Sequence, residues 1–188
     1  EEELAVAMLA MEDRVPLEIS HYLATRYMAM LYSHHMEYAM TLLRNEDVTN
    51  YNALHQNSSF LTFNLSQRDL SGLDLRSADF SGAELTGTNF SGCNLQDARF
   101  WLAEMPRSNL KNTDVTRVTF SRAILSSAIL TGIHGEAPDF SEAIMVDVSL
   151  SRLDGLRLAN FADADLAQAN LFDSSFPEAR FDGADFTL

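Results

Sequence analysis

Cysteine and lysine are nearly missing from this 188-residue sequence, which has only Cys93 and Lys111. A single cysteine forms no internal disulfide and builds no multi-cysteine zinc site, and it suits a reducing compartment. Long apolar runs are also missing: although 46% of the residues are hydrophobic, none of the runs reaches the ~18 residues that a membrane-spanning helix requires. The sequence therefore predicts a folded chain without a membrane span, and we expect it in the cytoplasm.

Basic residues are outnumbered, with 13 Lys and Arg against 27 Asp and Glu and a formal net charge of −14. Proteins that bind nucleic acid contact its phosphates through a basic face, so this charge argues against direct nucleic-acid binding. An acidic protein could instead imitate nucleic acid. The chain starts at Glu1 with no charged-then-apolar leader, which indicates a processed chain or a piece of a longer one.

A large apolar residue recurs at every fifth position from Phe60 onward. These centres run in steps of five to Leu150 and, after a slip of one residue, from Leu156 to Phe186; all are Leu, Phe, Met or Val except Gly135. Most residues two positions before a centre are small, about half of those immediately before it are Asp or Asn, and six of the eight glycines lie two positions after it. This period fits neither a strand nor an α-helix, so we expect short units that coil and stack.

Steps of twenty residues indicate how many sides each coil has. From the first centre these steps reach only phenylalanines, whereas just three other centres are Phe. Four five-residue units per coil would place the seven rings in one column, each about 4.8 Å above the last. The pattern predicts a mainly β chain, a four-sided β-helix of about 6.5 coils over residues 58–188. The predicted core column is Phe60, Phe80, Phe100, Phe120, Phe140, Phe161 and Phe181.

The A-[D/N]-[L/F]-x-x pattern is plain in NFADADLAQANLFDSSFPEARFDGADF at residues 160–186. It resembles the pentapeptide-repeat family over most of the chain. The resemblance implies a right-handed quadrilateral β-helix that binds another macromolecule. It extends to the Qnr and MfpA types, whose acidic rods occupy the DNA-binding surface of DNA gyrase, and to effectors of the SopA and NleL type, which attach such a β-helix to a ubiquitin-ligase domain.

Three functions stay open at this point. They are a protein–protein interaction scaffold, an acidic DNA mimic that binds and protects gyrase or topoisomerase, and the β-helix fragment of a secreted bacterial effector. Acidity supports mimicry only in part, because half of the acids in the repeat region occupy the position before a centre, where the repeat itself favours Asp or Asn. We therefore favour the scaffold, with another protein as partner.

Residues 1–57 lack the five-residue period and are predicted to be helical. Glu2–Glu12 is a short helix former, and Leu17–Arg44 contains neither Gly nor Pro. Apolar residues are spread over most of the circumference of the second helix, so we expect this surface to be buried against another part of the protein or a partner. We expect the segment to cap the open first coil of the β-helix or to form a homodimer, with the polar stretch Thr49–Ser59 as the junction.

Two groups of residues are candidate binding sites. Exposed apolar side chains usually mark a contact surface, although β-branched residues also simply suit strands. We predict one partner-binding patch formed by Trp101, Leu102, Ile124, Ile129, Ile144 and Val146. The regular spacing fails on the fourth side alone, where we expect a bulge or small loop that either binds a partner or is a tolerated insertion. This irregular side contains Ile133, His134, Gly135, Glu136, Asp154 and Gly155.

The sequence shows no catalytic constellation. Cys93 occupies the small inward position of its repeat, which favours a buried packing thiol over a nucleophile. His34 and His35 share a predicted helix with Glu37, but no pair forms a convincing metal set. Glycine-rich phosphate loops and serine elbows do not occur. We therefore predict no enzyme activity, no cofactor and no metal.

Overall fold

The computed structural model describes residues 17–57 and 62–188. The chain forms two compact units, Glu1–Tyr38 and Ala39–Leu188. Helix α2, Leu17–Arg44, crosses the boundary between them and has the bounds of the uninterrupted run in the sequence, whereas α3, Val48–Asn57, belongs to the second unit. Neither described helix is long and apolar enough to cross a membrane. The helix expected at Glu2–Glu12 lies outside the described residues.

Helix α3 occupies most of the stretch that we expected to be a polar junction. Asp47 begins it, because the Asp47 carboxylate accepts a hydrogen bond from the backbone N–H of Asn50 at 3.3 Å, as a helix N-cap does. Tyr51 is the buried residue of α3. Its ring contacts those of Phe63 and Phe80, with centroids 6.0 and 5.4 Å away. The polar composition of this segment therefore reflects a short helix with a narrow buried face.

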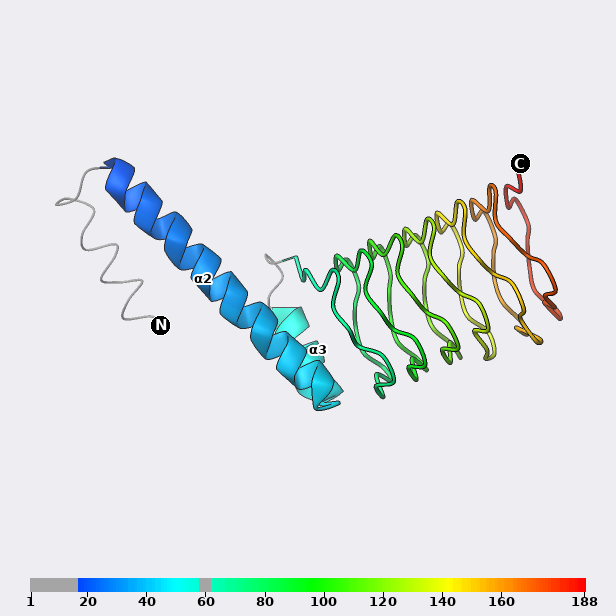
Figure 1. Ribbon diagram of the computed structural model, residues 1–188, viewed down its shortest axis with the longest axis horizontal. Coiled ribbons are helices and arrows are strands. Elements are labelled where there is room, and N and C mark those ends of the chain that lie inside the picture. Colours follow the sequence, from blue (N-terminus) through cyan, green and yellow to red (C-terminus); the bar gives the residue numbers. More distant parts are fainter. Residues whose placement is uncertain (1–16, 58–61) are drawn as a thin grey trace. The chain divides into compact units, whose positions relative to one another are not determined.

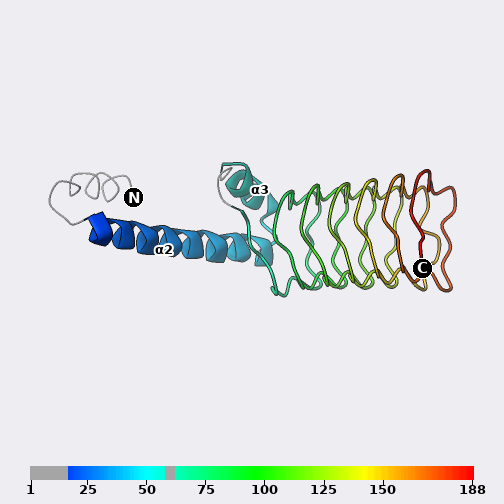
Figure 2. The same cartoon turned by 90° about the horizontal axis from the view of Figure 1, so that it is seen from above.

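Residues 62–188 form coils that stack along one axis (Figures 1 and 2). Isolated parallel bridges join residues twenty positions apart, such as Asn64 with Glu84, so four five-residue sides make one coil. Across the extra residue that precedes Leu156 the spacing becomes 21, as between Ile144 and Asp165, and it then returns to twenty. We number the sides by their centres: side 1 contains the Phe80 position, and sides 2, 3 and 4 follow along the chain.

The centres of side 1 form a stack of aromatic rings. Neighbouring ring centroids along Phe80, Phe100, Phe120, Phe140, Phe161 and Phe181 lie 4.8 to 5.0 Å apart, with interplanar angles of 18° or less. The first five of these rings are fully buried. Phe60, the first member of the predicted column, lies outside the described residues. The column therefore runs through the coils that the structure describes.

Small side chains two positions before the centres fill the rest of the interior. Where such a residue has a hydroxyl or thiol group, that group can donate to a backbone carbonyl of the coil below. Thr88 Oγ1, Cys93 Sγ and Thr113 Oγ1 each donate to the carbonyl of the centre 23 residues earlier, over 2.8 to 2.9 Å. The interior thus accepts polar atoms when a carbonyl is in reach.

Every corner from Gln67 to Gly183 has a positive φ, between 54° and 72°. The corner is the second residue after each centre, and it holds the six glycines that the repeat places there. Glycine adopts this left-handed conformation without strain, whereas other residues are strained by roughly 1–2 kcal/mol. The many non-glycine corners show that the stacked coils impose the conformation on whatever residue is present.

Side chains of the second unit's helical part satisfy the edge of the first described coil. The Asn52 amide donates to the Ser77 carbonyl at 2.9 Å and accepts from the Asp79 N–H at 2.8 Å. Glu46, in the turn between α2 and α3, accepts from the Asp74 N–H at 3.0 Å. In later coils the backbone N–H groups at the positions of Asp74 and Asp79 donate instead to backbone carbonyls of the preceding coil. The helical segment therefore supplies side-chain partners where a preceding coil would supply backbone ones.

Candidate functional site

One outward column on side 2 combines apolar and acidic side chains. Successive bridges join its members in a single ladder, here called the side-2 column: Asn64, Glu84, Glu104, Ile124, Ile144, Asp165 and Asp185. These residues directly precede the centres of side 2, which are buried from Leu65 to Leu166, and point away from them, as neighbouring residues in an extended chain do. All seven are half-buried or exposed. The column therefore presents two stacked isoleucines with two acids on each side.

The two isoleucines occupy positions where the repeat favours Asp or Asn. Elsewhere the side chain at this position accepts a hydrogen bond from the backbone N–H two residues later, as Asp69 does from Ser71 at 3.1 Å. Such Asx turns explain the preference for Asp and Asn. Ile124 and Ile144 cannot make this bond, and Ile144 leaves 42% of its surface exposed. A lost local bond and exposed apolar surface together mark this pair as unusual.

The other predicted patch residues lie around the isoleucine pair on more than one surface. Trp101 and Leu102, 47% and 45% exposed, form the corner between sides 1 and 2. Val146 is half-buried and begins the corner between sides 2 and 3. Ile129, 43% exposed, belongs to the ladder of side 3. The structure thus brings the two isoleucines into one ladder and places Ile129 on the neighbouring side.

Arginines on the other sides and corners pair with acids of neighbouring coils. Arg117 binds Asp97 at 2.7 Å, Arg122 binds Glu142 at 2.9 Å, and on side 1 Arg99 lies 3.5 Å from Asp79. The hydrogen bonds from Arg117 hold the pKa of Asp97 below its ordinary value. Within residues 17–57 and 62–188, no Arg or Lys pairs with the four acids of the side-2 column. The four acids of the side-2 column therefore lack ion pairs within the described part of the chain, although Arg122 and Arg107 stand at the corners of this side.

Two pairs of like charges stack directly on each other in the side-2 column. Glu84 bridges Glu104, and Asp165 bridges Asp185. Like charges directly opposite one another on a sheet are destabilising. Asp165 and Asp185 still accept the local backbone hydrogen bond, but Glu104 has no side-chain partner among the described residues. Glu84, by contrast, accepts a hydrogen bond from the Asn64 amide of the coil below, so only the Glu104 carboxylate is without a hydrogen-bond partner in the described part of the column.

On the irregular side 4, the large and small inward positions are exchanged in one repeat. Ile133 fills the small position and is 1% exposed, whereas Gly135 stands at the centre. Gly135 has a φ of 136°, and a Cβ there would lie 2.7 Å from the backbone nitrogen of Thr116. The backbone of this repeat therefore approaches the coil below too closely for a side chain at the centre.

The extra residue of side 4 lies one coil later. Residues 151–156 form no bridge, and Asp154 is exposed beside Gly155, whose φ is 75°. Pairing resumes where Glu136 bridges Arg157, and His134 keeps its own bridge to Asp114 in the coil below. The irregularity is thus a slip of one residue in a short bend. The six predicted residues of this side lie in two successive coils.

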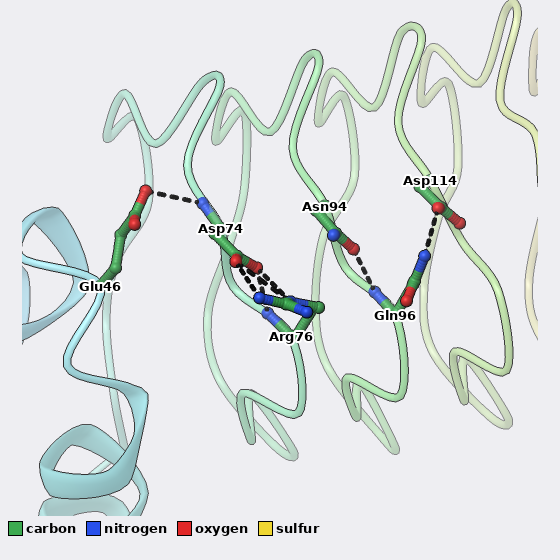
Figure 3. Close-up of polar contacts among 6 residues, drawn as sticks. All are labelled: Glu46, Asp74, Arg76, Asn94, Gln96 and Asp114. Atoms are coloured by element: carbon green, nitrogen blue, oxygen red, sulfur yellow. Dashed lines mark hydrogen bonds and ion pairs between the residues drawn. The ribbon is translucent and has the colours of Figure 1, made fainter.

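Near the helical segment, side 4 is occupied by polar contacts that satisfy one another (Figure 3). Glu46 binds the Asp74 backbone, the Asp74 carboxylate pairs with Arg76 at 2.6 Å, and Gln96 donates to Asp114 at 2.7 Å. Burial alone would raise the pKa of Asp114, but hydrogen bonds, led by that from Gln96, hold it below the ordinary value. Of these contacts, Gln96 with Asp114 joins two coils, Asp74 with Arg76 lies within one repeat, and Glu46 joins the helical segment to the first described coil.

Neither thiol chemistry nor metal binding finds support in the described residues. Cys93 is buried, and burial raises the pKa of its thiol to about 11. A thiol that stays protonated is a poor nucleophile. In the part of the chain that the structure describes, no three His, Cys, Asp or Glu side chains gather closely enough to hold a metal ion.

The model of the pentapeptide repeats family matches residues 64–97, 93–132 and 156–187, with eight copies. The chain belongs to the pentapeptide-repeat family. The match covers more than half of the sequence and leaves out residues 133–155, where Gly135 and the extra residue interrupt the repeat. Pentapeptide-repeat proteins are generally non-catalytic structural or binding proteins.

Solved structures of other pentapeptide-repeat proteins resemble the chain. Trypsin-treated QnrB1, a plasmid-mediated fluoroquinolone resistance protein, is 20% identical with a TM-score of 0.48, and the match covers 62% of this chain and 58% of that one. Rfr23 from the cyanobacterium Cyanothece 51142 is 18% identical with a TM-score of 0.44, over 65% and 84% of the two chains. The chain thus spans less than two thirds of that QnrB1 chain. A search of curated proteins finds no match.

The acidic members of the side-2 column were missed by the sequence analysis. Glu104 and Asp165 are 61 positions apart in the sequence, on opposite sides of the one-residue slip. The column can be found in the sequence by taking the residue before each centre at every twentieth position, and at 21 positions across the extra residue. Phe172, 75% exposed at a corner between sides 3 and 4, was also missed. A residue directly after a centre is outward by the same rule that identified Trp101.

Proposed function

We propose that this pentapeptide-repeat protein is a non-enzymatic scaffold that binds another protein through side 2. The observation that carries the proposal is the stacked pair Ile124 and Ile144, which replaces the Asp or Asn of the repeat and exposes apolar surface. Trp101 and Leu102 extend this surface across the adjoining corner. Aromatic side chains at the centre of a contact surface frequently contribute most of the binding energy.

The rigidity of the β-helix suits this role. Each coil is bonded to the next along every side, so outward side chains keep a fixed spacing before a partner arrives. A surface that is already ordered loses little conformational entropy on binding, which favours affinity. Apolar contact with isoleucine and tryptophan would then supply specificity at the middle of side 2, with the polar residues around it as the rim.

The test compares partner capture by the wild-type chain with capture by Trp101→Ala and Ile144→Asp. Partners cross-linked to the wild-type protein should be recovered at strongly reduced levels with both variants. Lys111→Ala, a substitution outside this surface, is the control and should retain them. Far-UV circular dichroism establishes that all variants are folded. Undiminished capture by both surface variants would contradict the proposal and assign the patch a purely structural role.

A second candidate is an acidic DNA mimic that binds and protects DNA gyrase or another topoisomerase. The net charge of −14 and the four acids of the side-2 column, which form no ion pair within the described residues, support it. In a supercoiling assay with purified gyrase and a quinolone, such a protein changes supercoiling or relieves inhibition by the drug. No change in either at micromolar protein would eliminate this candidate.

We also propose the finer architecture and setting that the sequence predicts. These are a right-handed helix of about 6.5 coils at a strand spacing of about 4.8 Å, a cytoplasmic location and a capping or dimerising role for residues 1–57. An effector fragment remains the alternative for a chain that belongs to a longer secreted protein. Light scattering of the intact chain tests the homodimer, which a monomeric mass would rule out.

A further inference from the structure

We infer that the side-2 column binds a basic, extended segment of a partner protein with an apolar residue at its centre. This inference rests on the proposed function and adds the chemistry of the partner. The column has negative charge at both ends, from Glu84 and Glu104 and from Asp165 and Asp185. Its centre is apolar. A ligand that complements it is positive at both ends and apolar between them.

Charge complementarity is the physical reason for a basic partner. The stacked acids of the side-2 column have no cation of this chain within ion-pair distance in residues 17–57 and 62–188, whereas corner acids such as Asp97 and Glu142 do. Like charges in register repel, so an external cation between them relieves repulsion as well as forming an ion pair. Arginine suits this role because its planar guanidinium can bind two carboxylates at once.

The spacing of the column fixes the length of the segment. The coil spacing seen in the side-1 rings is 4.8 to 5.0 Å. Glu104 and Asp165 are three coils apart in the ladder, or about 14 Å. An extended chain advances about 3.3 Å per residue, so about four residues span that distance. Because side chains alternate in an extended chain, two arginines four positions apart and an apolar residue midway share one face.

The probe is therefore the fluorescently labelled peptide Arg-Arg-Ser-Ile-Ser-Arg-Arg, titrated with the full chain at low salt. Binding should weaken at higher salt, because exposed ion pairs are screened. Replacing the central isoleucine of the peptide by serine should weaken binding severalfold. Ile144→Thr, which retains a β-branched residue on the protein, should reduce that difference between the two peptides, because only Ile124 of the isoleucine pair remains.

The decisive variant neutralises the four acids with isosteric amides, which can still accept the local hydrogen bonds: Glu84→Gln, Glu104→Gln, Asp165→Asn and Asp185→Asn. We expect at least a tenfold loss of affinity for the peptide, about what four exposed ion pairs supply. The control removes four negative charges away from side 2 and its corners: Asp97→Asn, Asp154→Asn, Asp173→Asn and Glu178→Gln. It changes the net charge equally and should reduce affinity by no more than about twofold.

Three outcomes overturn the inference. They are no binding of the peptide up to millimolar concentration, equal loss of affinity in the two four-site variants, and equal affinity for the isoleucine and serine peptides. The last two would mean attraction by net charge alone. Each leaves the scaffold proposal standing if Trp101→Ala and Ile144→Asp lose the captured partner. Conversely, selective peptide binding together with undiminished partner capture would reject the scaffold proposal and retain the chemistry of the column.

Discussion

Replacing Phe120 by alanine tests the register on which every surface assignment depends. The ring of Phe120 is fully buried and stacks between Phe100 and Phe140, with centroids 5.0 and 4.8 Å away. A buried aromatic side chain removes at least about 150 Å² from water, worth about 4 kcal/mol at about 25 cal/mol per Å². This value falls within the roughly 3–5 kcal/mol measured for Phe-to-Ala changes in protein cores. We expect the free energy of unfolding to fall by that amount.

Urea denaturation followed by far-UV circular dichroism measures the loss. Stacked repeats can unfold in parts, so the dependence of the unfolding free energy on urea must be the same in wild type and variant before the two are compared. Phe120→Leu is the matched control. It puts at this centre the residue found at many others, and we expect it to lose only about 1 kcal/mol because the volume is largely retained.

Lys111→Ala provides the comparison for an outward position and should change stability by less than about 0.5 kcal/mol. If it destabilised the protein as much as Phe120→Ala does, the inward and outward positions would be wrongly assigned. The side-2 column would then not exist as described, because it is defined from the same register.

Three further predictions concern other parts of the fold. Gly135→Ala should destabilise by at least about 2 kcal/mol, since its Cβ would meet the coil below, whereas Gly92→Ala, at an open corner, should lose only about 1 kcal/mol in the same urea assay. Because the pKa of Cys93 is raised to about 11, the folded state holds the thiol proton more tightly than the unfolded state. Stability should therefore fall as the pH rises from about 9 toward 11 and should fall less in Cys93→Ser; a flat profile in wild type would refute this. Asn52→Ala should expose the Asp79 N–H to exchange with deuterium, measured by mass spectrometry, while Asn52→Asp, which keeps an acceptor oxygen, should protect it.

Much of the fold was predictable because the repeat has its own periods. A large residue at every fifth position and the Phe residues at every twentieth identified the centres, and the ladder spacing of twenty and twenty-one agrees with the slip before Leu156. The corner glycines were equally informative, since only a left-handed corner explains their position. Leu17–Arg44 was readable from the lack of Gly and Pro.

Helix α3 lies within the stretch 1–57 that was predicted to be helical, but its bounds were not predictable from hydrophobic pattern. Its single buried side chain, Tyr51, gives no apolar period, and the polar Asn52 acts through the edge of a coil 25 positions later in the sequence. The local signal that could have identified it is Asp47, a helix N-cap placed shortly after the end of α2. Tertiary contacts stabilise this helix more than its own composition does.

The candidate site was predictable only in part, because neighbours on a side are twenty positions apart. Ile124 and Ile144 were found as apolar exceptions in an otherwise polar position. Ile129 was grouped with them because it is near in sequence, but a step of five moves a residue to the next side. In the sequence, the acids of the side-2 column cannot be told apart from the acids that the repeat itself favours before each centre. Only the structure shows that they lack basic partners among the residues it describes.

The twenty-residue ladder limits which length changes the gene tolerates without rearranging the surface. Inserting one five-residue unit would keep every centre inside, yet it would turn all later units by one side and divide the side-2 column between two sides. Inserting twenty residues would add a coil and leave each column intact. The single extra residue before Leu156 does neither, since Ile144 still pairs with Asp165. Relatives that share side 2 should therefore differ in length by whole coils, or by single residues absorbed in bends.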